Sequence, residues 1–170
     1  NRPRRFGKSL LSSTLKYYFQ GRKDLFQGLA IEKLETEWTE YPVLHMDFSV
    51  SKYTEADKLR EVLNIQISRW EKIYGKDAHE CSFSNRFEGV IQRAYQKTGK
   101  QVVVLVDEYD SPLLDTNADP TLQKELRNIV RDFFSPLKKN GQYLRFLLLT
   151  GISKFSQLSI FSELNNLKNI

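Results

Sequence analysis

A run of apolar residues that ends in two acids places the strongest constraint on the fold of this chain. Residues 101–106 (QVVVLV) show no alternation of polar and apolar side chains, and Asp107 and Glu108 follow them directly. A short, continuous apolar run is typical of a strand that is buried on both faces at the centre of a parallel sheet. The sequence therefore predicts an α/β fold with two carboxylates at the end of its central strand.

The hydrophobic pattern on either side of this strand alternates between helices and strands. Leu11, Leu15, Tyr18 and Phe19 fall at helical spacing, and Thr54 and Asp119 are the expected N-caps of later helices. We expect helices at 10–19, 54–74, 84–98 and 119–135, and strands at 42–49, 101–106 and 144–149. This order predicts a doubly wound parallel sheet in a single domain.

A phosphate-binding loop precedes the first helix. Gly7-Lys8-Ser9 at a helix N-terminus offers backbone N–H groups, the helix dipole and an ammonium to phosphate oxygens, and a hydroxyl to Mg²⁺. The general pattern G-x-x-x-x-G-K-[ST] has Arg2 at its first position, and Pro3 restricts Arg2 to extended conformations, so the entry to the turn must differ. A basic arm followed by a chance G-K-S is the alternative. The acids at 107–108 favour nucleotide binding.

Each candidate site residue has an expected role in binding ATP and Mg²⁺. Asp107 is expected to hold Mg²⁺ together with Ser9, and Glu108 to act as base or to position the attacking water. Thr150 or Ser153 would be a polar sensor beside the γ-phosphate, with an ordinary strand-end hydroxyl as the alternative for Thr150. The residues expected to contact the nucleotide are Arg4, Arg5, Phe6, Gly7, Lys8, Ser9 and Leu10.

Four other polar residues are given lesser roles. Asp110 would point the same way as Glu108 in an extended strand and is interpreted as a cap of the turn at 111–112. His45 and His79 lack a partner by spacing and are expected to be structural or exposed. Asp47 ends a strand and remains open as a residue that faces the site.

Composition excludes several classes of protein. The chain has 170 residues, of which 40% are hydrophobic, and a net charge of +5 that is dispersed rather than gathered in one run. This favours an anionic ligand over a nucleic-acid groove but leaves weak nucleic-acid contact open. Cys81 is the single cysteine, which excludes a disulfide framework and a cysteine zinc site. With no membrane-spanning stretch or signal peptide in the sequence, we expect a cytoplasmic location.

The quoted motifs resemble a known family. Residues 2–10 (RPRRFGKSL), 106–112 (VDEYDSP), 150–156 (TGISKFS) and 160–167 (IFSELNNL) are similar to the AAA-ATPase-like domain of uncharacterised bacterial proteins. The resemblance implies a three-layer α/β/α P-loop NTPase core of the ASCE/AAA-like type, and the arginine at the first loop position is shared with that family. It also implies an additional N-terminal strand, a C-terminal lid and, in many members, a following PD-(D/E)XK nuclease-like domain.

The expected sheet is incomplete within these residues. In ATPases with a glutamate after the strand-end aspartate, the sheet order is 5-1-4-3-2, and the three expected strands would be 2, 3 and 4. We therefore expect residues 1–170 to be a partial domain, truncated at both ends. Its fourth strand would have an unpaired edge, which favours association.

Three functional classes compete. The first is an ATPase whose hydrolysis drives a conformational or regulatory cycle, and the second is a nucleotide-binding switch or scaffold with little hydrolysis, which could regulate an attached nuclease-like domain. The third, a small-molecule phosphotransferase, would need an arginine-rich lid that is not evident. A homo-oligomer remains open as well.

Overall fold

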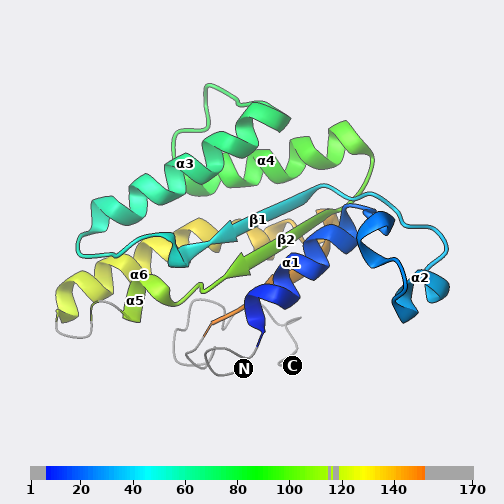
Figure 1. The fold of residues 1–170 in the computed structure, drawn as a ribbon. Coiled ribbons are helices and arrows are strands. Elements are labelled where there is room, and N and C mark those ends of the chain that lie inside the picture. The colour runs from blue at the N-terminus through cyan, green and yellow to red at the C-terminus, as the bar shows by residue number, and fades with distance from the viewer. Residues whose placement is uncertain (1–6, 115, 117–118, 152–170) are drawn as a thin grey trace.

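A computed structural model describes residues 7–114, 116 and 119–151 (Figure 1). It contains a parallel three-stranded sheet in the order β1-β2-β3, formed by Val43–Asp47, Val102–Asp107 and Leu144–Leu149. The helices are α1 (Lys8–Phe19), α2 (Ala30–Leu34), α3 (Ala56–Tyr74), α4 (Phe83–Thr98), α5 (Ser111–Leu114), α6 (Pro120–Phe134) and α7 (Pro136–Lys139). Three short 3₁₀ turns cover Lys23–Phe26, Phe48–Val50 and Gly141–Tyr143. The α/β class, the central position of β2 and the adjacency of the three strands are confirmed.

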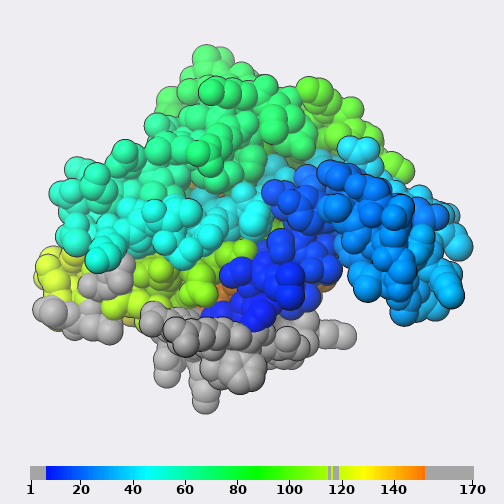
Figure 2. Space-filling model, viewed as in Figure 1, coloured from blue at the N-terminus to red at the C-terminus, as the bar shows by residue number. Residues whose placement is uncertain are grey.

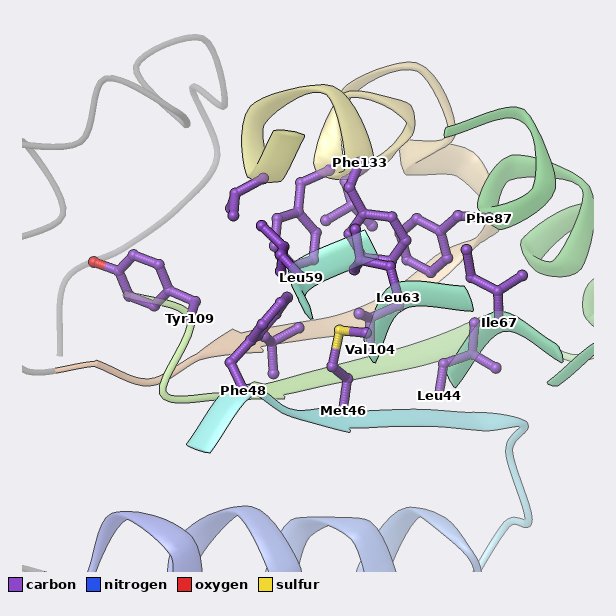
Figure 3. Packing of buried hydrophobic residues seen from close by; sticks show 14 of the residues in the cluster. Leu44, Met46, Phe48, Leu59, Leu63, Ile67, Phe87, Val104, Tyr109 and Phe133 are labelled. Carbon is purple, nitrogen blue, oxygen red and sulfur yellow. The ribbon is translucent and has the colours of Figure 1, made fainter. Parts of the chain in front are cut away.

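Helices cover both faces of the sheet. On one face, Leu44, Met46 and Val104 pack against α3, α4 and α6 through Leu63, Phe87 and other apolar side chains (Figure 3). On the other face, Val103 and Leu105 pack against Phe19 of α1. All six residues of β2 are buried, as the continuous apolar run predicts. The alternation of side chains along β1 and β2 places His45 and Asp107 on the α1 face.

Side chains cap the starts of α4 and α6 but not that of α3. The side chain of Asp119 accepts hydrogen bonds from the N–H groups of Thr121 and Leu122, so its predicted role as the N-cap of α6 is confirmed. The predicted cap at Thr54 is wrong. Glu55 takes that position in an extended conformation without a side-chain bond to the helix, because the helix begins one residue later than the sequence pattern indicates.

The buried face of α1 also differs from the prediction. Leu11 is 41% exposed, whereas Ser12 is fully buried. The reason is the orientation of the helix on the sheet: Phe19 packs on Val103 and Leu105, and the turn that contains Ser12 faces polar side chains of the sheet instead of apolar ones.

A buried ion pair joins α3 to α4. The guanidinium of Arg86 donates to both carboxylate oxygens of Glu71 at 2.7 and 2.8 Å, and a third nitrogen donates to Asn64. The hydrogen bonds from Arg86 hold the pKa of Glu71 below its ordinary value of 4.5. The pair therefore stabilises the fold at neutral pH, and this contribution is lost as the pH falls through the lowered pKa.

No helix within the described part of the chain is both long and apolar enough to cross a membrane.

We predict that Arg86→Met lowers the free energy of unfolding by about 3–5 kcal/mol, because it leaves the Glu71 carboxylate buried and unpaired. The double variant Glu71→Met/Arg86→Met removes both charges and should recover most of that loss. Urea unfolding at pH 7 measures both values. Equal stabilities for the single and double variants would contradict a buried, paired charge at this position.

Candidate functional site

The side chains of Asp107 and Thr150 and the backbone N–H of Glu108 meet where the parallel strands end. Because the strands are parallel, the carboxyl ends of β2 and β3 lie at the same edge of the sheet, which brings Asp107 next to Thr150. The hydroxyl of Thr150 donates to Asp107 Oδ1 at 2.9 Å and accepts from the backbone N–H of Glu108 at 3.3 Å. Thr150 therefore fixes one oxygen of the first acid and the backbone of the second.

His45 contacts the other oxygen of Asp107. Its Nε2 atom lies 3.0 Å from Asp107 Oδ2 and 3.4 Å from Ser12 Oγ. The prediction that His45 has no partner is wrong, because the partner is 62 residues away and only the register of β1 on β2 brings the two together. The continuous apolar run of β2 carries no signal for the face on which Asp107 lies, so the sequence pattern does not show this contact. His79, by contrast, is exposed and bonds locally, to Asp77.

The start of α1 lies against the second acid. Lys8 Nζ is 3.4 Å from Glu108 Oε1 and donates to the carbonyl of Gly151 at 3.3 Å. The side chain of Lys8 is only 9% exposed. Gly7, the N-cap of α1, has φ of 73°, a left-handed conformation that suits glycine. The loop lysine and the strand-end glutamate are therefore neighbours in space, although a hundred residues separate them in the sequence.

Glu108 has an unusual backbone. Its φ of 51° lies in the left-handed region, which non-glycine residues rarely adopt, and β2 ends one residue before it. This conformation directs Glu108 to Lys8 while Asp107 bonds His45 and Thr150. Asp110 therefore does not share an extended strand with Glu108; it lies directly before α5, at the turn that it was predicted to cap, and the capping role of its side chain stays a prediction. Asp110 is fully buried immediately before α5, and its carbonyl accepts from Leu113 and Leu114.

The remaining predicted site residues are placed only in part. Ser9 and Leu10 lie exposed in the first turn of α1, which is at the surface in the space-filling view (Figure 2). Asp47 accepts from the N–H of Ser49 and so caps a 3₁₀ turn. Arg4, Arg5, Phe6 and Ser153 lie outside the described residues.

Side-chain atoms of Tyr109 and Asp110 pack closely against Gly151. Burial raises the pKa of the Tyr109 hydroxyl, and the neighbouring Asp110 carboxylate raises it further. A Cβ atom added at Gly151 would lie 2.6 Å from both Asp110 Oδ1 and Tyr109 Cε1. Because Gly151 has no side chain, the backbone can pass close to Tyr109 and Asp110, and the Gly151 carbonyl can accept from Lys8.

Asp107 and Ser9 provide oxygen donors of the kind that hard metal ions bind. Within the described residues, no cluster of three or more His, Cys, Asp or Glu side chains is arranged to hold an ion. Asp107 and Ser9 offer a carboxylate and a hydroxyl, which is the small protein donor set that Mg²⁺ uses when phosphates and water supply its other ligands. The donors therefore fit Mg²⁺ bound with a phosphate and do not fit a protein-only metal centre.

A separate groove, with a volume of about 460 Å³, runs between α3, α4 and α6. Its lining is Arg60, Cys81, Ser82, Phe83, Glu125, Asn128, Ile129 and Asp132. Among the predicted site residues that the structure describes, none lines it.

Comparisons with known proteins give one family and one relative. The family described as "Predicted AAA-ATPase" (AAA-ATPase-like) matches residues 1–161. The chain is also similar to an "Uncharacterized protein in vnfD 5'region" of Azotobacter chroococcum mcd 1, with 39% identity over 175 residues. That alignment covers 100% of this chain and 33% of the relative, so the chain spans about a third of the relative's length. No solved structure matches the chain.

We predict that Gly151→Ala lowers the free energy of unfolding by roughly 1–3 kcal/mol, because the added methyl group overlaps buried atoms of Tyr109 and Asp110. Gly141→Ala is the matched control, since nothing lies within 4 Å of its added Cβ. Thermal or urea unfolding measures both. If Gly151→Ala lowers the free energy of unfolding no more than Gly141→Ala does, Tyr109 and Asp110 are not tightly packed against Gly151.

Proposed function

The chain belongs to the AAA-ATPase-like family, and from this membership we propose that it binds ATP with Mg²⁺ at the start of α1 and hydrolyses it. The observation that carries the proposal is the contact of Lys8, at the start of α1, with Glu108, which directly follows Asp107 at the end of β2. A phosphate-binding cation, a metal-binding carboxylate and a water-activating carboxylate are the groups that phosphoryl transfer to water requires.

The first turn of α1 is proposed to hold the phosphates. The leading N–H groups of a helix have no partner within the helix, and the helix dipole adds partial positive charge at the same place. The first backbone bond of α1 runs from Leu11 N to Gly7 O, so the N–H groups of Lys8, Ser9 and Leu10 remain for a ligand. The Lys8 ammonium adds a full charge beside them.

Binding is proposed to proceed by exchange of an ion pair. Lys8 now contacts Glu108 at 3.4 Å, and a β- or γ-phosphate would replace that carboxylate as the partner of the ammonium. Glu108 is then released to accept a hydrogen bond, and afterwards a proton, from the attacking water. The same contact explains why the lysine is well positioned before nucleotide arrives.

Asp107 and Ser9 are proposed to hold Mg²⁺. When bound there, the ion neutralises charge on the phosphate oxygens. Thr150 holds Asp107 Oδ1 and the backbone of Glu108, so we propose that its sensor role works through these two acids. Arg4, Arg5 and Phe6 are proposed as further nucleotide contacts from the family resemblance.

The wider context of this activity is also a proposal. A three-layer P-loop core needs strands beyond the three described here, and residues 1–170 would then be part of such a domain. Because the chain spans about a third of its relative, a conformational or regulatory cycle, an oligomer, an attached nuclease-like domain and a cytoplasmic location are proposed for the whole protein. A nucleotide-binding switch with little hydrolysis is the second candidate, favoured by the buried, already paired state of Lys8.

We predict that Lys8→Ala weakens Mg-ATP binding at least 10-fold, since a charge-assisted phosphate contact contributes roughly 1.5–3 kcal/mol. Isothermal calorimetry on the purified full-length protein measures this. Lys16→Ala is the matched control, because Lys16 lies in the last turn of the same helix and should leave the affinity unchanged. Equal affinities for Lys8→Ala and wild type would rule out the proposed binding site.

We predict opposite effects for substitutions of the two adjacent acids. Glu108→Gln should keep ATP bound, because it removes only the competing partner of Lys8, and should slow hydrolysis roughly 10²–10⁴-fold. Asp107→Asn should instead raise the Mg²⁺ concentration needed for binding. Turnover and binding assays at several Mg²⁺ concentrations separate these outcomes. A wild-type turnover rate in Glu108→Gln would contradict the proposed role of Glu108, and no turnover above background in the wild-type protein would favour the switch with little hydrolysis.

A further inference from the structure

We propose that His45 is a positioning residue for the metal-binding carboxylate of Asp107, an inference that rests on the proposed Mg-ATP site. Neither the family match nor the curated relative assigns a role to a histidine on β1. Sequence spacing did not indicate one either, because the two residues meet only through the sheet register.

The first argument is that Asp107 is held on both oxygens. Thr150 Oγ1 lies 2.9 Å from Oδ1, and His45 Nε2 lies 3.0 Å from Oδ2. With a donor on each oxygen, the carboxylate cannot turn about its bond to Cβ without losing a hydrogen bond. Each carboxylate oxygen has two lone-pair sites, so one site per oxygen remains for the metal or its water. His45 therefore orients Asp107 and leaves lone-pair sites on its carboxylate free to bind the metal.

The second argument is that the imidazole is itself held in place. Ser12 Oγ lies 3.4 Å from the same Nε2 atom, and the carbonyl of His45 accepts from Gln66 at 3.2 Å. The His45 side chain is 26% exposed, against 6% for Asp107. The ring thus contacts Ser12 of α1 as well as the nearly buried carboxylate, and Gln66 of α3 holds the backbone of β1 at the same residue.

The third argument concerns the link to the phosphate loop. Ser12 lies three residues after Ser9, so the two side chains share one face of α1. A chain of contacts therefore runs from Ser12 through His45 and Asp107 to Thr150. It connects the helix that is proposed to bind phosphate with the ends of β2 and β3. These contacts tie Asp107 to the helix that carries Ser9.

The choice of residue type fits this role. An ionised carboxylate only accepts hydrogen bonds, so the N–H that faces it must come from its neighbour. A neutral imidazole can supply such a donor, whereas a lysine or arginine would add a full positive charge beside the proposed metal. Groups that orient metal ligands in this way typically change metal affinity 10–100-fold when they are removed.

The test compares variants of the chain's two histidines. His45→Phe keeps a ring of similar size but removes the donor, and His45→Gln restores an amide donor near the position of Nε2. His79→Phe is the matched control, because the His79 side chain is 96% exposed. Calorimetry of ATP binding over a series of Mg²⁺ concentrations, on the purified full-length protein, gives the Mg²⁺ midpoint of each variant. Urea unfolding is measured in parallel.

We expect His45→Phe to raise the Mg²⁺ midpoint roughly 10–100-fold. His45→Gln should return it to near the wild-type value, and His79→Phe should leave it unchanged. If His45→Phe does not fold, His45→Asn serves instead, because its amide is polar but too short to reach Asp107, and the same rise is expected.

Two results overturn the inference, and they are distinguishable. A wild-type midpoint in His45→Phe or His45→Asn, with normal Mg²⁺-dependent binding by the wild type, refutes the role of His45 alone. A loss of stability without a change of midpoint has the same meaning, since a purely structural histidine would produce it. Absence of Mg²⁺-dependent ATP binding in the wild-type protein refutes both this inference and the proposed function.

Discussion

Strand β2 is buried along its whole length between two parallel neighbours, and the rest of the molecule is arranged to make that burial possible. A strand without a polar face needs cover on both sides, which α1 supplies on one face and α3, α4 and α6 on the other (Figure 1). The parallel pairing then brings every strand's carboxyl end to one edge. The polar residues that follow the strands are thereby gathered at this edge, beside the start of α1.

The candidate site is formed by the residues at the end of β2. Asp107 keeps the regular alternation of the strand and faces α1, whereas Glu108 has a positive φ and turns to Lys8. Two adjacent acids therefore leave the strand in different directions with different partners. The Asp107 carboxylate is held by hydrogen bonds with Thr150 and His45, whereas the Glu108 carboxylate is paired with the ammonium of Lys8. This difference in partners is the physical basis for giving them different roles.

Much of this arrangement could be predicted from the sequence, because it depends on local pattern. The apolar run at 101–106 indicated the central strand, and Asp119 followed by Pro120 indicated the start of α6. The contacts of His45, the burial of Ser12 and the turn at Glu108 could not be predicted in this way. They depend on the register of β1 against β2 and on how α1 lies across the sheet, which spacing along one chain does not show.

The central claim is that phosphate replaces Glu108 as the partner of Lys8 while Asp107 stays where His45 and Thr150 hold it. A crystal structure with Mg²⁺ and a non-hydrolysable ATP analogue measures this directly. The account predicts that the terminal phosphates lie at the first turn of α1 with Lys8 Nζ on them, and that the contacts of Asp107 with His45 and Thr150 are retained. A nucleotide bound elsewhere, or at α1 with Lys8 still paired to Glu108, would contradict it.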